Sequence, residues 1–273
     1  MTNQNLTTAL RKLRLSGLLN SLEMRLHEAT AAGLSHVEFL ELILQDELLV
    51  RGDRQIQRRI TQASFRDQRR IEDFDFSFNP SIKRSHIYEL ASCRFIHEHR
   101  DLLLIGPPGT GKSHLVQGLG LAAIRHGFLV YYRSIFDVVR DFLADEALEG
   151  HERTLQRYLK PDLLIIDDMG IKQLPKRSGE FLFEIIMRRY ELRSTMMTSN
   201  RPIGDWGKLL GDVPAATAIL DRFLHRAEIL EITGRSYRLH DRQESSKGTK
   251  APTAPADDTK RASKPSKGTT SDE

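Results

Sequence analysis

The amino-acid sequence predicts an α/β protein with a parallel sheet flanked by helices, preceded by a small all-α region and followed by a disordered tail. Between about residues 74 and 239, short apolar runs alternate with helical patterns, as they do in β-α-β units. Over residues 6–63, leucines recur at helical spacings and no proline occurs. Residues 245–273 contain no leucine, isoleucine, valine or aromatic residue, so they cannot bury enough surface to offset their ordering entropy. We therefore expect a helical region at 1–70, an α/β region at 71–241 and a disordered tail at 242–273.

The composition excludes several classes of protein. The chain has 273 residues, of which 39% are hydrophobic and 29% charged, and its formal net charge is only +4. One cysteine, Cys93, allows neither an internal disulfide nor a zinc cluster, which indicates an intracellular protein. The first residues lack the apolar run of a secretory signal, and no apolar stretch approaches the ~18 residues of a membrane-spanning helix. We therefore expect a cytoplasmic protein without membrane contacts.

The N-terminal region should contain several helices. Ser35 and Glu38 have the spacing of a capping box, which predicts that a long helix starts here. Gly17 and Gly33 are predicted to separate the helices. We expect the apolar side of the long helix to consist of Phe39, Leu40, Ile43, Leu44, Leu48 and Leu49.

Five segments of the α/β region read as strands. Each is a short apolar or β-branched run bounded by turn residues or helical patterns. The predicted strands are Leu102–Ile105, Leu129–Tyr132, Leu163–Ile166, Ser194–Thr198 and Ile229–Ile232.

A glycine-rich loop follows the first predicted strand and leads into a helix. It matches the phosphate-binding pattern G-x-x-x-x-G-K-[ST] in the strand–loop–helix setting that the pattern requires. The glycines permit a backbone that aims successive amides at phosphate oxygens, Lys112 should reach the β- and γ-phosphates of ATP, and Ser113 should bind Mg²⁺. The predicted nucleotide contacts are Gly106, Pro107, Pro108, Gly109, Thr110, Gly111, Lys112, Ser113 and His114.

Two aspartates, Asp167 and Asp168, directly follow the third predicted strand. Four apolar residues before them bury this strand on both faces, and ligands of open α/β sheets bind at the carboxyl ends of strands. Asp167 is predicted to hold Mg²⁺ through water, and Asp168 to polarise the water that attacks the γ-phosphate. A strand followed by a solvated acidic turn is the simpler alternative, which the glycine-rich loop makes less attractive.

A polar residue follows the fourth predicted strand. In the segment Thr198–Pro202, Asn200 is the best candidate to hydrogen-bond the γ-phosphate or the attacking water. An ordinary turn before Arg201-Pro202 would have the same sequence.

Together these elements resemble the AAA+ ATPases. Three further segments narrow the resemblance: Phe74–Pro80, Ala218–His225 and Gly234–Leu239. With them, residues 6–241 are similar to the IstB group, the helper ATPases of insertion sequences, which are related to the DnaC helicase loaders.

The resemblance implies an ATPase that assembles as a homo-oligomer in the presence of ATP. It would bind double-stranded target DNA and direct a transposase encoded by the same element, in the bacterial cytoplasm and at the nucleoid. By the same resemblance, Arg222 would act on the γ-phosphate of a neighbouring subunit, and Arg238 would sense the nucleotide. The segment around Phe76 and Pro80 would border the adenine through apolar contact, or would simply pack against the edge of the domain. A surface arginine paired with Asp221 is the simpler interpretation of Arg222.

Residues 51–70 carry seven arginines against two aspartates. A helical face of this kind suits contacts with DNA phosphates, although such a run is often only a solvated surface. The predicted DNA contacts are Arg51, Arg54, Arg58 and Arg59.

Two other functions remain possible from the sequence. A DnaC-type loader would dock on a replicative helicase through its N-terminal helices, and a P-loop kinase would phosphorylate a small metabolite. The paired aspartates favour hydrolysis over the kinase.

Overall fold

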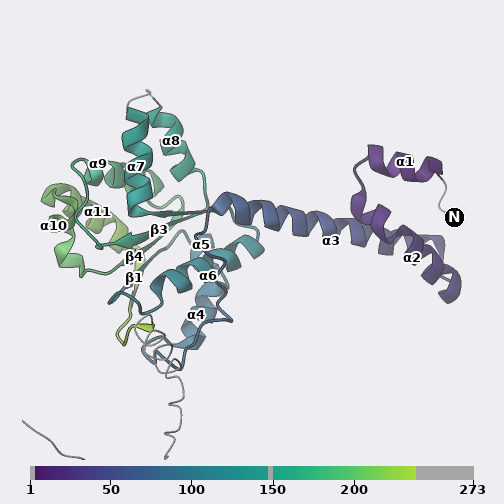
Figure 1. Ribbon diagram of the computed structural model, residues 1–273, viewed down its shortest axis with the longest axis horizontal. Helices are drawn as coiled ribbons and strands as arrows, with labels where there is room; N and C mark the ends of the chain where they lie inside the picture. Colours follow the sequence, from purple (N-terminus) through teal and green to yellow (C-terminus); the bar gives the residue numbers. More distant parts are fainter. Residues whose placement is uncertain (1–3, 147–149, 238–273) are drawn as a thin grey trace, which may run out of the picture. The chain divides into compact units, whose positions relative to one another are not determined.

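The computed structural model describes residues 4–146 and 150–237, which include a sheet of five parallel strands (Figure 1). The strand order is β2-β3-β4-β1-β5. All five predicted strands are confirmed, but β3 continues through both aspartates instead of ending before them. The bounds are β1 Asp101–Ile105, β2 Val130–Ser134, β3 Leu163–Met169, β4 Ser194–Ser199 and β5 Ala227–Glu231.

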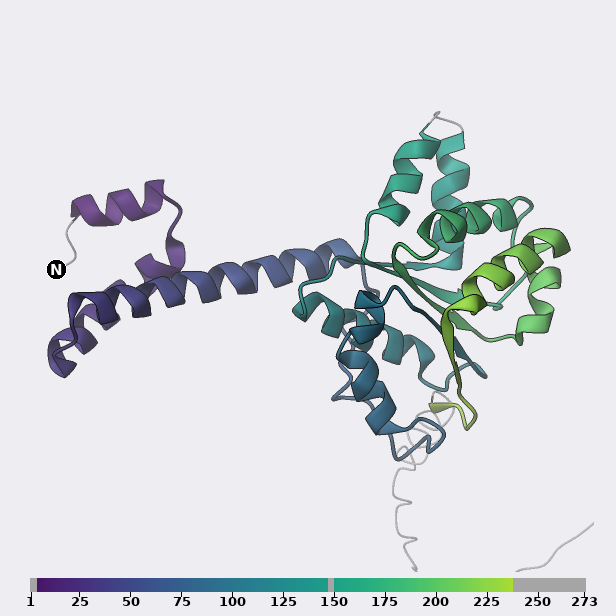
Figure 2. The same ribbon diagram turned by 180° about the vertical axis from the view of Figure 1, so that it is seen from behind.

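Helices cover both faces of the sheet (Figures 1 and 2). Because side chains alternate along a strand, Leu102 and Leu104 of β1 join the core on one face and Leu103 joins the core on the other. The first face carries α4 (Arg84–Ala91), α5 (Arg94–His97), α6 (Lys112–Arg125) and the C-terminal end of α3. The second carries α7 (Ile135–Glu146), α8 (His151–Leu159), α9 (Ser178–Arg189), the short helices η1 (Ile203–Asp205) and α10 (Trp206–Leu210), and α11 (Val213–His225).

Three helices make up the N-terminal region: α1 (Gln4–Lys12), α2 (Ser16–Ala32) and α3 (His36–Ala63). The predicted capping box starts α3, with the Glu38 amide donating to Ser35 Oγ at 3.3 Å and the Ser35 amide donating to Glu38 Oε2 at 2.8 Å. Gly33 ends α2 in the left-handed conformation, with φ of 64°, as predicted for a break between helices.

Two expectations for these helices are wrong. The first break lies before Ser16, and Gly17 is inside α2, where a side chain would collide with the backbone of Glu47 on α3. Gly17 therefore serves close packing of two helices. Of the predicted apolar side of α3, Ile43 is buried and Phe39 partly so, whereas four leucines are more than half exposed: Leu40, Leu44, Leu48 and Leu49. The small core shared by α1, α2 and α3 covers only one stripe of α3.

The predicted boundary between residues 70 and 71 stays a prediction. The boundary at 241/242 and the predicted tail lie outside the described residues. Within the described ranges, no helix combines the length and apolarity needed to cross a lipid bilayer.

Candidate functional site

The glycine-rich loop wraps around the lysine side chain at the start of α6. Gly109 and Gly111 have φ of 84° and 96°, in the left-handed region that favours glycine. Lys112 is only 5% exposed, and its Nζ donates to the carbonyl oxygens of Gly106 and Pro107, both at 2.7 Å. The loop thus has the positive charge and the helix N-terminus that a polyphosphate requires.

The segments before β1 and after β5 pack against this loop. The Tyr237 amide donates to the Gly109 carbonyl at 2.9 Å, and a side chain at Gly109 would collide with Ser236. On the other side, the Phe74 ring lies against Gly111, where a side chain would collide with it. The glycines are required because neighbouring segments approach them closely.

Two aromatic residues lie beside the loop, and the predicted adenine contact of the segment around Phe76 and Pro80 stays a prediction. Phe74, rather than Phe76, lies directly against the glycine-rich loop and meets the His114 ring edge-on at 5.3 Å between centroids. Phe76 packs behind it, 4.9 Å from the Phe74 ring. His114 also bonds the Arg70 carbonyl through Nε2 at 2.7 Å.

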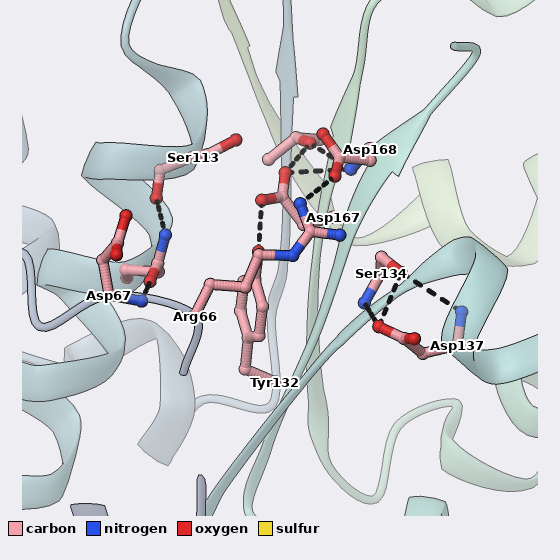
Figure 3. Close-up of polar contacts among 10 residues, drawn as sticks. Arg66, Asp67, Ser113, Tyr132, Ser134, Asp137, Asp167 and Asp168 are labelled. Atoms are coloured by element: carbon pink, nitrogen blue, oxygen red, sulfur yellow. Dashed lines mark hydrogen bonds and ion pairs between the residues drawn. The ribbon is translucent and has the colours of Figure 1, made fainter. Parts of the chain in front are cut away.

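Asp167 is fully buried within β3, and both of its carboxylate oxygens have hydrogen-bond partners (Figure 3). Tyr132 of β2 donates its hydroxyl to Oδ2 at 2.6 Å, and Thr198 of β4 donates its hydroxyl to Oδ1. Burial, together with the nearby Asp167 carboxylate, raises the pKa of the Tyr132 hydroxyl, so Tyr132 remains a donor. Two neighbouring strands therefore fix the carboxylate of Asp167.

Asp168 has an unusual backbone conformation, with φ of 68°. Its amide donates to Asp167 Oδ1 at 2.9 Å and to Thr198 Oγ1 at 3.1 Å, which fixes this backbone conformation. Its side chain is 15% exposed and forms an ion pair with Arg66, with 2.7 Å between Oδ2 and the guanidinium.

Asn200 lies at the same edge of the sheet. Strand β4, which precedes it, pairs with β1 on one side and β3 on the other. The Asn200 amide donates to the Met169 carbonyl at 2.8 Å, and its side chain is partly buried. The predicted loop, the two aspartates and Asn200 thus meet at the carboxyl edge of adjacent strands, where open α/β sheets bind ligands.

Comparison with known sequences assigns the chain to a family. A sequence model described as IstB-like ATP binding protein matches residues 8–245. The chain belongs to this family. A candidate ATP-binding protein of insertion sequence IS5376 from Geobacillus stearothermophilus is 37% identical over 79% of this IstB-like chain and 86% of its own length. A corresponding protein of IS21 from Pseudomonas aeruginosa is 35% identical over 93% and 96%, respectively.

Solved structures agree with the AAA+ fold. The replication initiator DnaA bound to AMPPCP and single-stranded DNA superimposes with a TM-score of 0.54 at 22% identity. The match covers 68% of the IstB-like chain and 56% of that protein, and it shows the shared fold.

The structure places Arg222 on the surface of α11. Its side chain is 48% exposed, with Nε 3.9 Å from Asp221 Oδ2, and its guanidinium lies 5.6 Å from the centre of the Tyr190 ring. Within the single chain, Arg222 is therefore a surface arginine near Asp221, which is the simpler interpretation of its sequence. Arg238, the predicted nucleotide sensor, lies outside the described residues.

The predicted DNA-contacting arginines lie on α3. Arg51 pairs with Glu47 at 2.8 Å, Arg54 bonds Ser16 Oγ, and Arg59 bonds the Gly127 carbonyl. Arg58 is exposed. The opposite side of α3, formed by Ile56, Ile60 and Ala63, packs against the core of the α/β region. The arginines Arg51, Arg54 and Arg58 are thus turned away from that core.

Two residues of the site were not predicted from the sequence. Tyr132 was assigned to a strand without a role, and Arg66 was counted only among the arginines of the basic segment. No local pattern marks either residue, because each acts through a partner distant in sequence: 35 residues for Tyr132 and Asp167, and 102 for Arg66 and Asp168.

Proposed function

We propose that this protein is an ATP-hydrolysing, DNA-binding helper of transposition. It assembles on double-stranded target DNA and recruits or activates a separate transposase of the same element for target-site selection. The observation that carries the proposal is the junction of Lys112, Asp167, Asp168 and Asn200 at one sheet edge, in a chain whose insertion-sequence relatives match it along most of its length.

The side chains at the edge suit hydrolysis of ATP. Lys112 would leave its loop carbonyls to bind the β- and γ-phosphates, which offer a stronger, charged acceptor. Asp168 would act as general base for the attacking water, and Asn200 would orient that water or the γ-phosphate.

The oxygen donors of the site also fit Mg²⁺. The Ser113 hydroxyl lies at the start of α6, and Asp167 presents a carboxylate whose oxygens are already hydrogen-bonded, which suits contact through a bound water (Figure 3). Mg²⁺ would neutralise charge on the phosphates, which supply its remaining ligands. Oxygens of two side chains, Ser113 and Asp167, would therefore be enough to hold Mg²⁺ on the phosphates.

Assembly would complete the site through Arg222. Among the described residues, its exposed guanidinium has a long contact with Asp221 and lies near the Tyr190 ring, so a neighbouring subunit's γ-phosphate would bind it more strongly. Hydrolysis would then depend on the contact between subunits, as it does where an arginine finger acts in trans.

The exposed basic side of α3 supports binding to DNA. Arg51, Arg54 and Arg58 lie on one side of the helix, and phosphate contacts of this kind give affinity without reading sequence. The likeness to DnaA bound to single-stranded DNA is consistent with a nucleic-acid partner. The insertion-sequence relatives favour transposition over loading of a replicative helicase.

A complementation experiment tests hydrolysis and assembly together. Lys112→Ala and Arg222→Ala should each hydrolyse ATP at least about tenfold more slowly than the wild type, because each removes a cation from the phosphates. When the two are mixed with duplex DNA, activity should return. A Lys112→Ala subunit would then supply Arg222 to the intact loop of an Arg222→Ala neighbour.

Two results would contradict the proposal. Unchanged turnover in Lys112→Ala would exclude the glycine-rich loop as the ATP site. If activity failed to return at every mixing ratio, Arg222 would not act in trans. Size-exclusion chromatography with ATP and duplex DNA monitors assembly in the same samples.

A further inference from the structure

Three consecutive residues that follow the C-cap of α3 each contact a different part of the candidate ATPase site. Ser64 ends the helix with φ of 59° and turns the chain toward the sheet. Phe65, Arg66 and Asp67 follow (Figure 3 shows the last two). Their contacts fix the connection between α3 and the site.

Phe65 packs against Tyr132 of β2 and against α6. Its ring lies 5.9 Å from the ring of Tyr132, whose hydroxyl donates to Asp167. It also lies so close to Gly120 of α6 that a side chain there would collide with it at 2.9 Å. Phe65 thus anchors the segment between β2 and α6.

Asp67 ties the segment to the phosphate-binding helix. Its amide donates to Gln117 Oε1 at 3.0 Å, and Gln117 Nε2 donates to the Ser113 carbonyl at 3.1 Å. Gln117 is buried, and both bonds are partly shielded from water. The backbone on either side of Arg66 is therefore held in place.

Between these anchors, Arg66 reaches the carboxylate of Asp168. The pair joins residues 102 positions apart, and the guanidinium is 2.7 Å from Asp168 Oδ2. Partial burial lowers the pKa of Arg66, but the acidic groups around it raise this pKa by more than burial lowers it. The net pKa is raised, so the guanidinium stays charged. Because the Arg66 side chain is 53% exposed, such a pair adds little to the stability of the fold.

What the pair does fix is the orientation of one carboxylate. The backbone of Asp168 is set by its bonds to Asp167 and Thr198, so the rotation of the side chain decides where the carboxylate points. Arg66 engages Oδ2 and thereby restricts this rotation.

We propose that Arg66 is a positioning residue for ATP hydrolysis, which orients the carboxylate of Asp168 and links that orientation to helix α3. The inference rests on the proposed function and adds a regulatory connection to the same site. Arg66 lies three residues after Ala63, the last residue of the helix that carries the basic residues Arg51, Arg54 and Arg58. DNA bound along α3 therefore influences hydrolysis through the segment 64–67.

Steady-state kinetics with and without duplex DNA test the proposal. Arg66→Ala should lower kcat about tenfold with little change in KM, because a misoriented general base slows the chemical step without weakening binding. It should also lose most of any stimulation by DNA, and Arg66→Lys should recover part of kcat. Arg94→Ala removes another exposed ion pair, between Arg94 of α5 and Glu98 at 2.6 Å, and should behave as the wild type.

A double variant separates positioning from a direct action on phosphate. If Arg66 acts through Asp168, Arg66→Ala/Asp168→Asn should be no slower than Asp168→Asn alone. A further tenfold loss in the double variant would overturn the proposal, as would a kcat for Arg66→Ala equal to that of the wild type.

Hydrogen exchange of the nucleotide-free protein tests the connection without any hydrolysis. In Arg66→Ala and in Asp168→Asn alike, the Asp67 amide should exchange faster, whereas Arg94→Ala should leave it unchanged. Exchange unchanged in both site variants would overturn the proposal. Should the wild type bind ATP but not hydrolyse it, the proposed ATPase function would fail, and this exchange comparison would still show whether the pair fixes the segment.

Discussion

The carboxyl edge of the sheet and the N-terminal helices differ in how far their side chains are buried. At the edge, Asp167 is fully buried and both carboxylate oxygens accept hydrogen bonds within one chain. In the N-terminal helices, the buried core is small, consisting of Leu10, Leu18, Leu22 and Ile43. Leucines on α3 remain exposed, Leu48 by 68%. The edge is thus a rigid site built from the sheet core, whereas the N-terminal helices contribute mainly surface.

Large-to-small substitutions should give the largest difference between the two regions, measured as loss of the free energy of unfolding. Ile165→Ala, in the centre of β3, should lower the free energy of unfolding by about 3 kcal/mol, because it leaves a cavity in a closely packed core. Leu44→Ala, at a side chain 52% exposed on α3, should change it by less than about 0.5 kcal/mol. Urea unfolding followed by circular dichroism measures both. A large loss in Leu44→Ala would show that the α3 leucines are covered in solution.

The same contrast explains what the sequence could predict. The five strands, the glycine-rich loop and the capping box at Ser35 each depend on residues close together in sequence, and all are present. The error at Gly17 arose because a glycine can break a helix or let two helices approach, and only the position of α3 decides between them. The pairing of Arg66 with Asp168 depends on how α3 meets the sheet, which no local pattern encodes.

Burial was also harder to predict in the N-terminal helices than in the sheet. A strand inside a parallel sheet is covered on both faces, so its apolar run implies burial. In the first half of α3, Ile43 is buried with leucines of α1 and α2, whereas the neighbouring leucines of α3 are exposed.

Removing charge from α3 should affect binding to DNA and leave the sheet edge intact. Arg54→Ala/Arg58→Ala should weaken affinity for duplex DNA about tenfold and reduce the slope of log affinity against log salt by about 2, since two phosphate contacts are lost. ATP binding should not change. Fluorescence anisotropy at several salt concentrations measures this, with Arg94→Ala/Arg140→Ala as a control that removes two exposed arginines from other helices. An unaltered slope would place the DNA elsewhere on the protein.

The smallest expected effect is a change in stability on breaking the ion pair that joins α2 to α3. Arg25 bonds both oxygens of Asp46 at 2.9 Å, and these bonds hold the pKa of Asp46 at about 2, below its usual 3.8. A lowered pKa in the folded state means that the carboxylate stabilises the fold above about pH 4, and that this contribution is lost as the pH falls toward 2.

Asp46→Asn should therefore cost about 1 kcal/mol at pH 6 and less at pH 3, where part of the wild-type contribution has already gone. Urea midpoints at the two pH values measure the difference, and Asp53→Asn, at an exposed aspartate of the same helix, is the control. An equal cost for Asp46→Asn at both pH values would mean that the pair contributes through packing alone. The α2–α3 contact would then depend on close approach at Gly17 rather than on charge.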